Sequence, residues 1–263
     1  MAVLPAFLSA FEAHRAGRFA EAEQGYRAVL AVEPRNADAR HLLGLIAQQH
    51  GDLKAAAALI EDALRISGPN ADFLANLGVI YEAQNRSADA VQVLEQAIKI
   101  DPKSFTSQFA LGNAFKSLGR FDEALLRYQA AMPFEPENAS LHNNMGSALQ
   151  SLGRLDEAAQ AYRRATTLRP DHGGAYYNLG VVQKDMGQTA EAAESFRSAI
   201  RLLPDLIDAH INLGVVLQDK KLLEQAVAKA REDAQLTPGD ATANRLAAAL
   251  SELAARLARD GRL

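Results

Sequence analysis

Small and bulky apolar residues recur along most of the chain at a constant interval of 34 residues. One column consists of alanines, and a second column, four residues later, is bulky. Residues four apart lie on one face of an α-helix, so each pair of columns predicts a helix that buries this face. The alanines are Ala22, Ala56, Ala90, Ala124, Ala158, Ala192 and Ala226, and the bulky residues are Tyr26, Ile60, Leu94, Tyr128, Tyr162 and Phe196.

A column of glycines repeats at the same interval and predicts a partner helix for each of these helices. Two helices approach closely only where one of them offers a glycine or an alanine, so we expect the bulky residues to fill the space beside the glycines. A second alanine column leaves room for the first helix of the next repeat. The glycines are Gly44, Gly78, Gly112, Gly146, Gly180 and Gly214, and the second alanines are Ala63, Ala97, Ala131, Ala165 and Ala199.

Proline, glycine and short polar residues mark the predicted helix ends. Prolines on the 34-residue grid are expected to end the second helix of each repeat: Pro34, Pro102, Pro136, Pro170, Pro204 and Pro238. Glycines that favour a left-handed backbone are expected to end the first helix: Gly17, Gly51, Gly119, Gly153 and Gly187. Residues two positions after the proline slots predict N-caps: Asn36, Asn70, Ser104, Asn138 and Asp240.

The stretch from Asn144 to Ala165, with Gly146, Gly153, Ala158 and Tyr162, resembles the signature of the tetratricopeptide repeat family. The resemblance implies an all-α fold, a right-handed αα-superhelix or solenoid of helical hairpins with a concave groove. One domain, 1–263, is expected. Its repeats would span 3–36, 37–70, 71–104, 105–138, 139–172, 173–206 and 207–240, followed by a capping helix at 241–263.

The composition argues against chemistry and for a soluble binding protein. The net charge of −4 gives no general attraction to nucleic acid or to anionic membranes. The chain has no cysteine, its six histidines are dispersed over different repeats, and no apolar run approaches the roughly 20 residues that span a bilayer. We therefore expect no catalytic residues, no metal and no cofactor, and a cytoplasmic, bacterial protein.

In the family, the first helix of each repeat lines the groove, and its sixth position is asparagine in several repeats of this chain. This broken ladder resembles the asparagine ladder in the repeat domain of O-linked N-acetylglucosamine transferases. Asparagine amides both donate and accept hydrogen bonds, so they suit a peptide backbone, although they could also simply solvate the wall. The expected groove residues are Asn76, Asn113, Lys116, Asn143, Asn144, Ser147, Gln150, Tyr177, Asn178, Lys184 and Asn212.

Toward the N-terminus the expected groove wall becomes apolar, with Leu4, Phe7, Leu8 and Phe11 on one helical face, then Leu42 and Leu45. Two interpretations are open. The favoured one is a rotated or shifted first helix that buries the stripe, because terminal repeats are often atypical. The other is an apolar docking site for a partner helix or for a second copy of the chain.

Two functions from different classes fit these features. The leading hypothesis is a scaffold that holds an extended peptide or a helix of another protein in the groove. The alternative is the substrate-targeting part of a larger bacterial glycosyl-, sulfo- or methyltransferase, by analogy only. A helical RNA binder is disfavoured, because the charge is acidic and no regular basic column exists.

Overall fold

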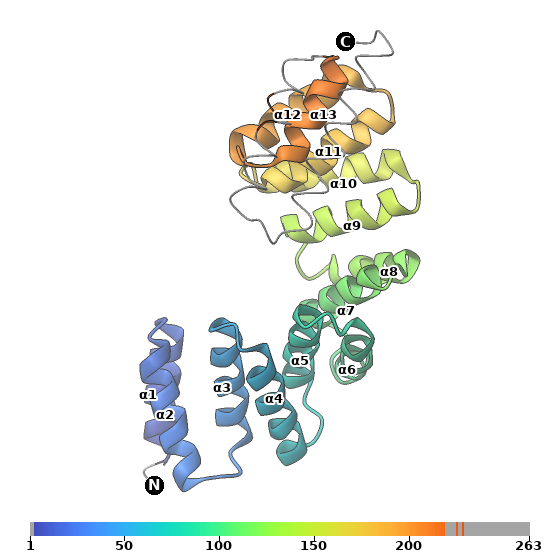
Figure 1. Cartoon of the computed structure of the whole chain (residues 1–263). Coiled ribbons are helices and arrows are strands. Elements are labelled where there is room, and N and C mark those ends of the chain that lie inside the picture. The colour runs from blue at the N-terminus through green and yellow to red at the C-terminus, as the bar shows by residue number, and fades with distance from the viewer. Residues whose placement is uncertain (1–2, 219–224, 226–227, 229–263) are drawn as a thin grey trace. The chain divides into compact units, whose positions relative to one another are not determined.

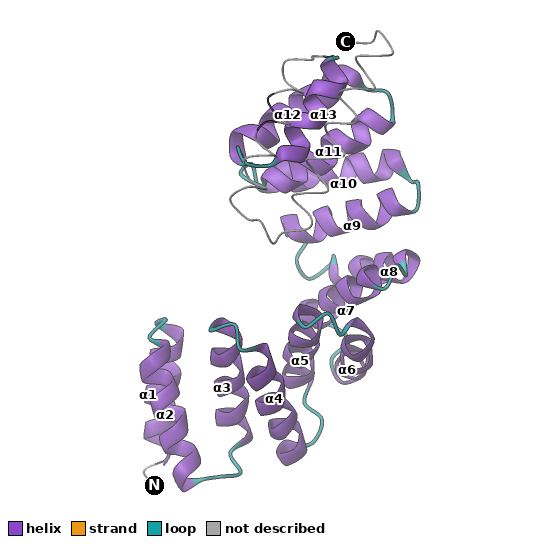
Figure 2. Ribbon diagram, viewed as in Figure 1, coloured by secondary structure: helices purple, strands orange, loops and turns teal. Residues whose placement is uncertain are grey.

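A computed structural model of the chain describes residues 3–218, 225 and 228. Within these residues it contains thirteen α-helices and no strand, so the predicted all-α class is confirmed (Figures 1 and 2). The helices are α1 (Val3–Arg15), α2 (Phe19–Val32), α3 (Ala37–Gln49), α4 (Leu53–Ser67), α5 (Ala71–Ala83), α6 (Ser87–Ile100), α7 (Phe105–Ser117), α8 (Phe121–Ala131), α9 (Ala139–Ser151), α10 (Leu155–Leu168), α11 (Gly173–Asp185), α12 (Thr189–Leu202) and α13 (Ile207–Leu217).

Consecutive helices pair as hairpins, with odd-numbered first helices and even-numbered second helices. The chain divides into two compact units, residues 1–136 with α1 to α8, and residues 137–263, whose described helices are α9 to α13. Six of the seven predicted hairpins are present at the predicted positions. The second helix of the repeat at 207–240, the capping helix at 241–263 and the cap at Asp240 lie outside the described residues. The single domain stays a prediction.

Each hairpin from the second to the sixth is held by contact between a glycine and a bulky side chain. A Cβ atom built on Gly146 would lie 2.8 Å from Tyr162 Cδ1, and one on Gly180 would lie 2.7 Å from Phe196 Cε1. The same contact joins Gly44 to Ile60, Gly78 to Leu94 and Gly112 to Tyr128. The five bulky side chains are buried almost completely, as the column pattern predicts.

The first hairpin reverses this arrangement, which the column pattern did not predict. Ala10 occupies the glycine position of α1, and the compensating glycine, Gly25, lies on α2. A Cβ atom on Gly25 would lie 2.5 Å from Ala10 Cβ, so the close approach is preserved with the small residue transferred to the other helix. Tyr26 remains fully buried beside it.

The helix ends follow the predicted turn chemistry closely. Asn36, Asn70, Ser104 and Asn138 each accept a hydrogen bond from the backbone N–H three residues later, which satisfies an otherwise unpaired donor of the next helix. The predicted turn glycines have positive φ, as in Gly17 at 73°. The third hairpin uses an asparagine in this place, and Asn85 has a φ of 60°.

Two helices end earlier than the grid predicts. Helix α8 ends at Ala131, because Pro133 lacks the N–H that would continue the helix, so Pro136 is not the residue that stops it. Helix α13 ends at Leu217, where Gln218 takes a left-handed conformation with a φ of 53°. This turn precedes Lys221, the residue that stands at the glycine slot of the grid.

The hairpin contact predicts opposite outcomes for two glycine substitutions in α11. Gly180→Ala places a methyl group against the ring of buried Phe196 and should lower the free energy of unfolding by about 1–3 kcal/mol. Gly174→Ala meets only ordinary contacts with His172, and should be neutral or stabilise by up to about 1 kcal/mol. Urea unfolding monitored by circular dichroism measures both. Equal effects would contradict the proposed packing.

Candidate functional site

The surface that carries the predicted binding residues is formed by the first helices. First helices contact the next first helix within each unit: α3 with α5 and α5 with α7 in the first unit, α9 with α11 and α11 with α13 in the second. We call the side of these helices that faces away from the second helices the first-helix face. All eleven predicted groove residues are partly exposed: Asn76, Asn113, Lys116, Asn143, Asn144, Ser147, Gln150, Tyr177, Asn178, Lys184 and Asn212.

The asparagines of the sixth position bridge neighbouring first helices. Asn178 Nδ2 donates a hydrogen bond of 3.2 Å to Asn143 Oδ1, which is the fifth position of the preceding first helix. In the first unit, Asn76 Nδ2 lies 2.9 Å from Nε2 of His41, again a fifth position. The amides are therefore oriented by the fold, a role that the sequence pattern did not assign to them.

His41 was missed as a member of this face. Its ring stacks on Phe73, with centroids 4.2 Å apart, and its side chain is buried. Burial lowers the pKa of His41 to about 4, against the attraction of Asp38 and Asp72. The imidazole is therefore neutral near pH 7, and its unprotonated Nε2 accepts the hydrogen bond from Asn76. A histidine at the fifth position, aligned with Asn143, is the signal that could have revealed it.

A second polar group in the second unit joins α11 to α13. Lys184 Nζ donates to Asn212 Oδ1 at 2.7 Å, and Asn212 Nδ2 donates to the carbonyl oxygen of Asp208 at 2.9 Å. Tyr177 also hydrogen-bonds Asn212, and burial raises the pKa of its hydroxyl. Three of the predicted groove residues thus form one connected group that keeps the Lys184 ammonium beside an amide.

Two tyrosines of the second helices reach through the hairpin to the first-helix face. Tyr128 Oη donates to Asn113 Oδ1 at 2.9 Å, and Tyr162 Oη donates to Gln150 Oε1 at 3.1 Å. Burial raises the pKa of both hydroxyls, so they remain protonated donors over the physiological range. The rings pack against Gly112 and Gly146 while the hydroxyls orient amides on the surface.

A charged pair lies at the end of the first-helix face in the first unit. Ser117 Oγ donates to Glu82 Oε2 at 2.9 Å. Burial lowers the pKa of Lys116, and the nearby Glu82 carboxylate opposes this shift. Glu82 and Ser117 were not among the predicted site residues. Glu82 occupies the same repeat position as Lys116 and Lys184, and Ser117 occupies the next position.

The favoured interpretation of the N-terminal stripe is wrong. Leu4, Leu8 and Phe11 are 67%, 50% and 38% exposed, whereas Ala10 and Ala13 are buried against the rest of the hairpin. Phe7 is the exception, since its ring lies 5.8 Å from that of Tyr26. The 34-residue grid therefore holds in α1, and the stripe belongs to the first-helix face, together with the partly exposed Leu42 and Leu45.

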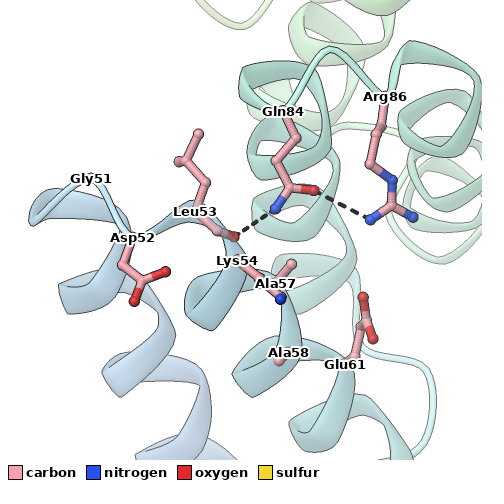
Figure 3. Close-up of a pocket in the computed structure, with 9 residues that line it drawn as sticks. All are labelled: Gly51, Asp52, Leu53, Lys54, Ala57, Ala58, Glu61, Gln84 and Arg86. Carbon is pink, nitrogen blue, oxygen red and sulfur yellow. Dashed lines mark hydrogen bonds between the residues drawn. The ribbon is translucent and has the colours of Figure 1, made fainter.

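A hollow of roughly 680 Å³ beside the turn before α4 is a less suitable site (Figure 3). Gln84 Nε2 donates to the carbonyl oxygen of Leu53 at 2.7 Å, and Arg86 Nη1 donates to Gln84 Oε1 at 3.2 Å. The first bond joins the second hairpin to the third, and the second bond lies within the third hairpin, so both engage polar groups with the fold itself. The lining is Gly51, Asp52, Leu53, Lys54, Ala57, Ala58, Glu61, Gln84 and Arg86.

A smaller cavity of about 450 Å³ lies between α2, α3 and α4. Here Val29 replaces the small alanine of the second alanine column and is almost completely buried. A valine is larger than an alanine, so this position leaves less room for the close approach of the next first helix. Leu30, Leu43, Ile46 and Leu59 supply apolar lining of the cavity.

Neither a metal site nor a membrane-spanning helix is evident in the described part of the chain. No group of three or more histidine, cysteine, aspartate or glutamate side chains there is placed to hold a metal ion. Among the described helices, none combines the length and the apolar character needed to cross a bilayer.

Models of the tetratricopeptide repeat family match most of the chain. One model, described as "Tetratricopeptide repeat", matches residues 12–71, 43–105 and 177–241, and a second model with that description matches 137–205. A model described as "TPR repeat" matches 112–153. Because the first model alone covers more than half of the chain, the chain belongs to the tetratricopeptide repeat family, and the predicted solenoid fold of helical hairpins is shown. The comparison with curated proteins gave no match.

Solved structures with the same fold include PilF, YrrB and MamA. PilF of Pseudomonas aeruginosa is 18% identical with a TM-score of 0.66, and the match covers 81% of this chain and 96% of that one. YrrB is 22% identical with a TM-score of 0.59, covering 70% and 95%. MamA is 23% identical with a TM-score of 0.57, covering 63% and 91%. At these identities the likeness concerns the fold alone.

The neutral state of His41 predicts a pH dependence of stability. The unfolded chain protonates this histidine near the ordinary histidine pKa of 6.5, and the folded chain only near 4, so the unfolded state binds more protons between these values. Stability is therefore lost as the pH falls through this window. His41→Gln keeps an acceptor for Asn76 but cannot be protonated in this range. Urea unfolding at about pH 7 and about pH 4.5 should show a smaller acid-induced loss in the variant than in the wild type. An equal loss would show that His41 carries a proton in the folded state.

Proposed function

We propose that this chain is a scaffold that holds a segment of another protein against its first-helix face, and that it carries out no catalytic step. The observation that carries the proposal is the row of partly exposed amides in the second unit, whose orientation the fold fixes through Asn143 with Asn178 and Tyr162 with Gln150. Groups that are already oriented lose little conformational freedom on binding, which favours affinity.

The amides of this row retain capacity for a ligand. An asparagine side chain offers two N–H donors and two carbonyl lone pairs. The bridge uses one donor of Asn178 and one lone pair of Asn143, and Asn143 Nδ2 also donates to Asn144 Oδ1 at 3.4 Å. The remaining positions suit the alternating donors and acceptors of an extended peptide backbone. YrrB, which has the same fold, is described as a TPR protein with an unusual peptide-binding site, which supports a peptide as the ligand class.

The cellular location and the transferase alternative also remain proposals. The absence of cysteine fits a reducing compartment, so we retain the cytoplasm of a bacterium as the location. The transferase alternative would make the same first-helix face a substrate-delivery surface, and it predicts a transferase or its substrate as the captured protein. Identification of the captured protein therefore distinguishes the two.

Site-specific photocrosslinking tests the proposed face. A photoreactive benzoylphenylalanine replaces exposed Asp185 at the end of α11, and in the matched control it replaces exposed Gln160 on α10. The proposal predicts that crosslinking in the native cell joins a partner protein to the Asp185 position and not to the Gln160 position. Equal capture at both positions, or capture at Gln160 alone, would contradict it.

A double substitution tests the amide row in the same assay. Asn143→Ala with Asn178→Ala removes both partners of the bridging hydrogen bond. It also removes the 3.4 Å bond from Asn143 Nδ2 to Asn144 Oδ1, and Asn144 is partly exposed, so the free energy of unfolding should change by less than about 1 kcal/mol. Crosslinking from Asp185 should fall about tenfold or more, because each lost backbone contact removes roughly 1 kcal/mol. Unchanged capture would assign the asparagines a structural role only.

A further inference from the structure

The first unit presents an apolar strip that its own fold leaves uncovered. Leu4, Leu8 and Phe11 lie on one side of α1, at the second, sixth and ninth positions of the repeat. Leu42 and Leu45, at the sixth and ninth positions of α3, extend the strip to the next first helix and are only partly exposed. Leu42 packs on the same core cluster as Phe7.

Two carboxylates border this strip, and Arg35, which lines a hollow together with Asp38, is exposed and forms no ion pair with it. Asp38 and Asp72 hold the second position of α3 and α5 and are exposed. Asp38 lies on the same helix as His41, and Asp72 is the neighbour in sequence of Phe73, whose ring stacks on that of His41. Neither carboxylate forms an ion pair within the described residues, whereas Asp62 and Asp89 on second helices are paired with arginines.

The charges near the carboxylates do not neutralise them. His41 is neutral near pH 7, and Arg40, the neighbouring cation of α3, is engaged with the carbonyl oxygen of Pro34 and with Asp62. Arg15 is a cation of α1, but it ends the helix, at the opposite end from Leu4. The strip is thus apolar in its middle and negative at the end where α3 and α5 begin.

We propose that the first-helix face of the first unit binds an amphipathic helix of another protein whose apolar side chains cover Leu4, Leu8 and Phe11 and whose lysines or arginines pair with Asp38 and Asp72. The proposal rests on the scaffold function and adds the chemical class of the partner for this unit. A positively charged segment gains from two carboxylates that form no ion pair with a cation of the described residues, and the apolar strip supplies the burial that an amphipathic helix needs.

The same charges disfavour other occupants of the strip. In a symmetric contact between two copies through this face, the same apolar and acidic patch is contributed twice, so the second copy brings more carboxylates and no row of cations to pair with Asp38 and Asp72. Carboxylates that enter an interface without a partner cost free energy. An anionic lipid surface is repelled for the same reason.

Fluorescence anisotropy with two synthetic helical peptides tests the partner class. The peptides share their length and leucine positions, and one carries lysine where the other carries glutamate. The lysine peptide should bind the full chain at least about tenfold more tightly than the glutamate peptide, and added salt should reduce this preference because it screens exposed charges. Equal affinity for both peptides would overturn the proposal.

Variants locate the interaction on the surface. Asp38→Asn with Asp72→Asn should weaken the lysine peptide about three- to tenfold, the range expected for two exposed ion pairs. The matched control, Asp122→Asn with Asp156→Asn, removes the same charge from exposed sites on second helices and should leave binding unchanged. Leu4→Ser with Leu8→Ser should abolish binding without loss of helical circular dichroism, since both side chains are half exposed or more. Equal effects of the two aspartate pairs would overturn the assignment of the site.

Sedimentation equilibrium examines the competing occupant, a second copy. The proposal predicts that the chain does not associate with itself through this face, so the measured mass should not rise with protein concentration on its account. Self-association that Leu4→Ser with Leu8→Ser removes would assign the strip to a second copy and overturn the proposal. Failure of these peptide experiments would leave the crosslinking from Asp185 in the second unit unaffected, so the proposed scaffold function and this inference fail separately.

Discussion

The close contact between a glycine on the first helix and a bulky side chain on the second is the constraint on which the rest of the structure depends. It fixes which side of each first helix is buried, and so which side is left for the first-helix face. The first hairpin shows that the constraint is spatial rather than chemical, because Ala10 stands at the glycine position of α1 and Gly25 on α2 preserves the close approach. Leu4, Leu8 and Phe11 are exposed because this contact holds in α1 as well.

The same contact connects the core to the surface chemistry. The ring of Tyr128 fills the space beside Gly112 and the ring of Tyr162 fills the space beside Gly146, while their hydroxyls hold Asn113 and Gln150. A side chain that packs the hairpin therefore also orients a polar group on the face. Neighbouring first helices add a second set of restraints through Asn143 with Asn178. The two units differ in what they offer: apolar and acidic groups near α1 and α3, and oriented amides on α9 and α11.

The regular parts of the fold were predictable because each depends on one residue type at one repeated position. Glycine, alanine and capping residues on the 34-residue grid predicted the hairpins, their close contacts and their N-caps. Departures from the repeat pattern were harder to predict, because they arise from residues outside the repeated columns. Pro133 shortens α8, and Gly25 supplies the glycine that α1 lacks at Ala10. A repeated residue type identifies a structurally important position, but it does not reveal when a residue at a different position fulfils the same packing requirement.

The candidate site was predictable as a surface and not as a set of interactions. The positions of the first-helix face followed from the repeat, and all the predicted residues are partly exposed. The bridges of Asn76 to His41 and of Asn178 to Asn143 join residues 35 positions apart, and their geometry depends on the packing of successive hairpins. The apolar stripe was misjudged, because terminal repeats are often atypical and the first helix was expected to be rotated or shifted, whereas the burial of Ala10 and Ala13 shows that α1 keeps the register of the repeat.

Hydrogen exchange of the full chain, with and without the protein that it captures, tests the central claim most directly. The account predicts that partner binding slows exchange in peptides from the first helices, such as α9 and α11, and leaves the second helices α10 and α12 unchanged, because the partner covers the first-helix face. Protection confined to the second helices, or none in the first helices, would contradict the assignment of that face as the binding surface.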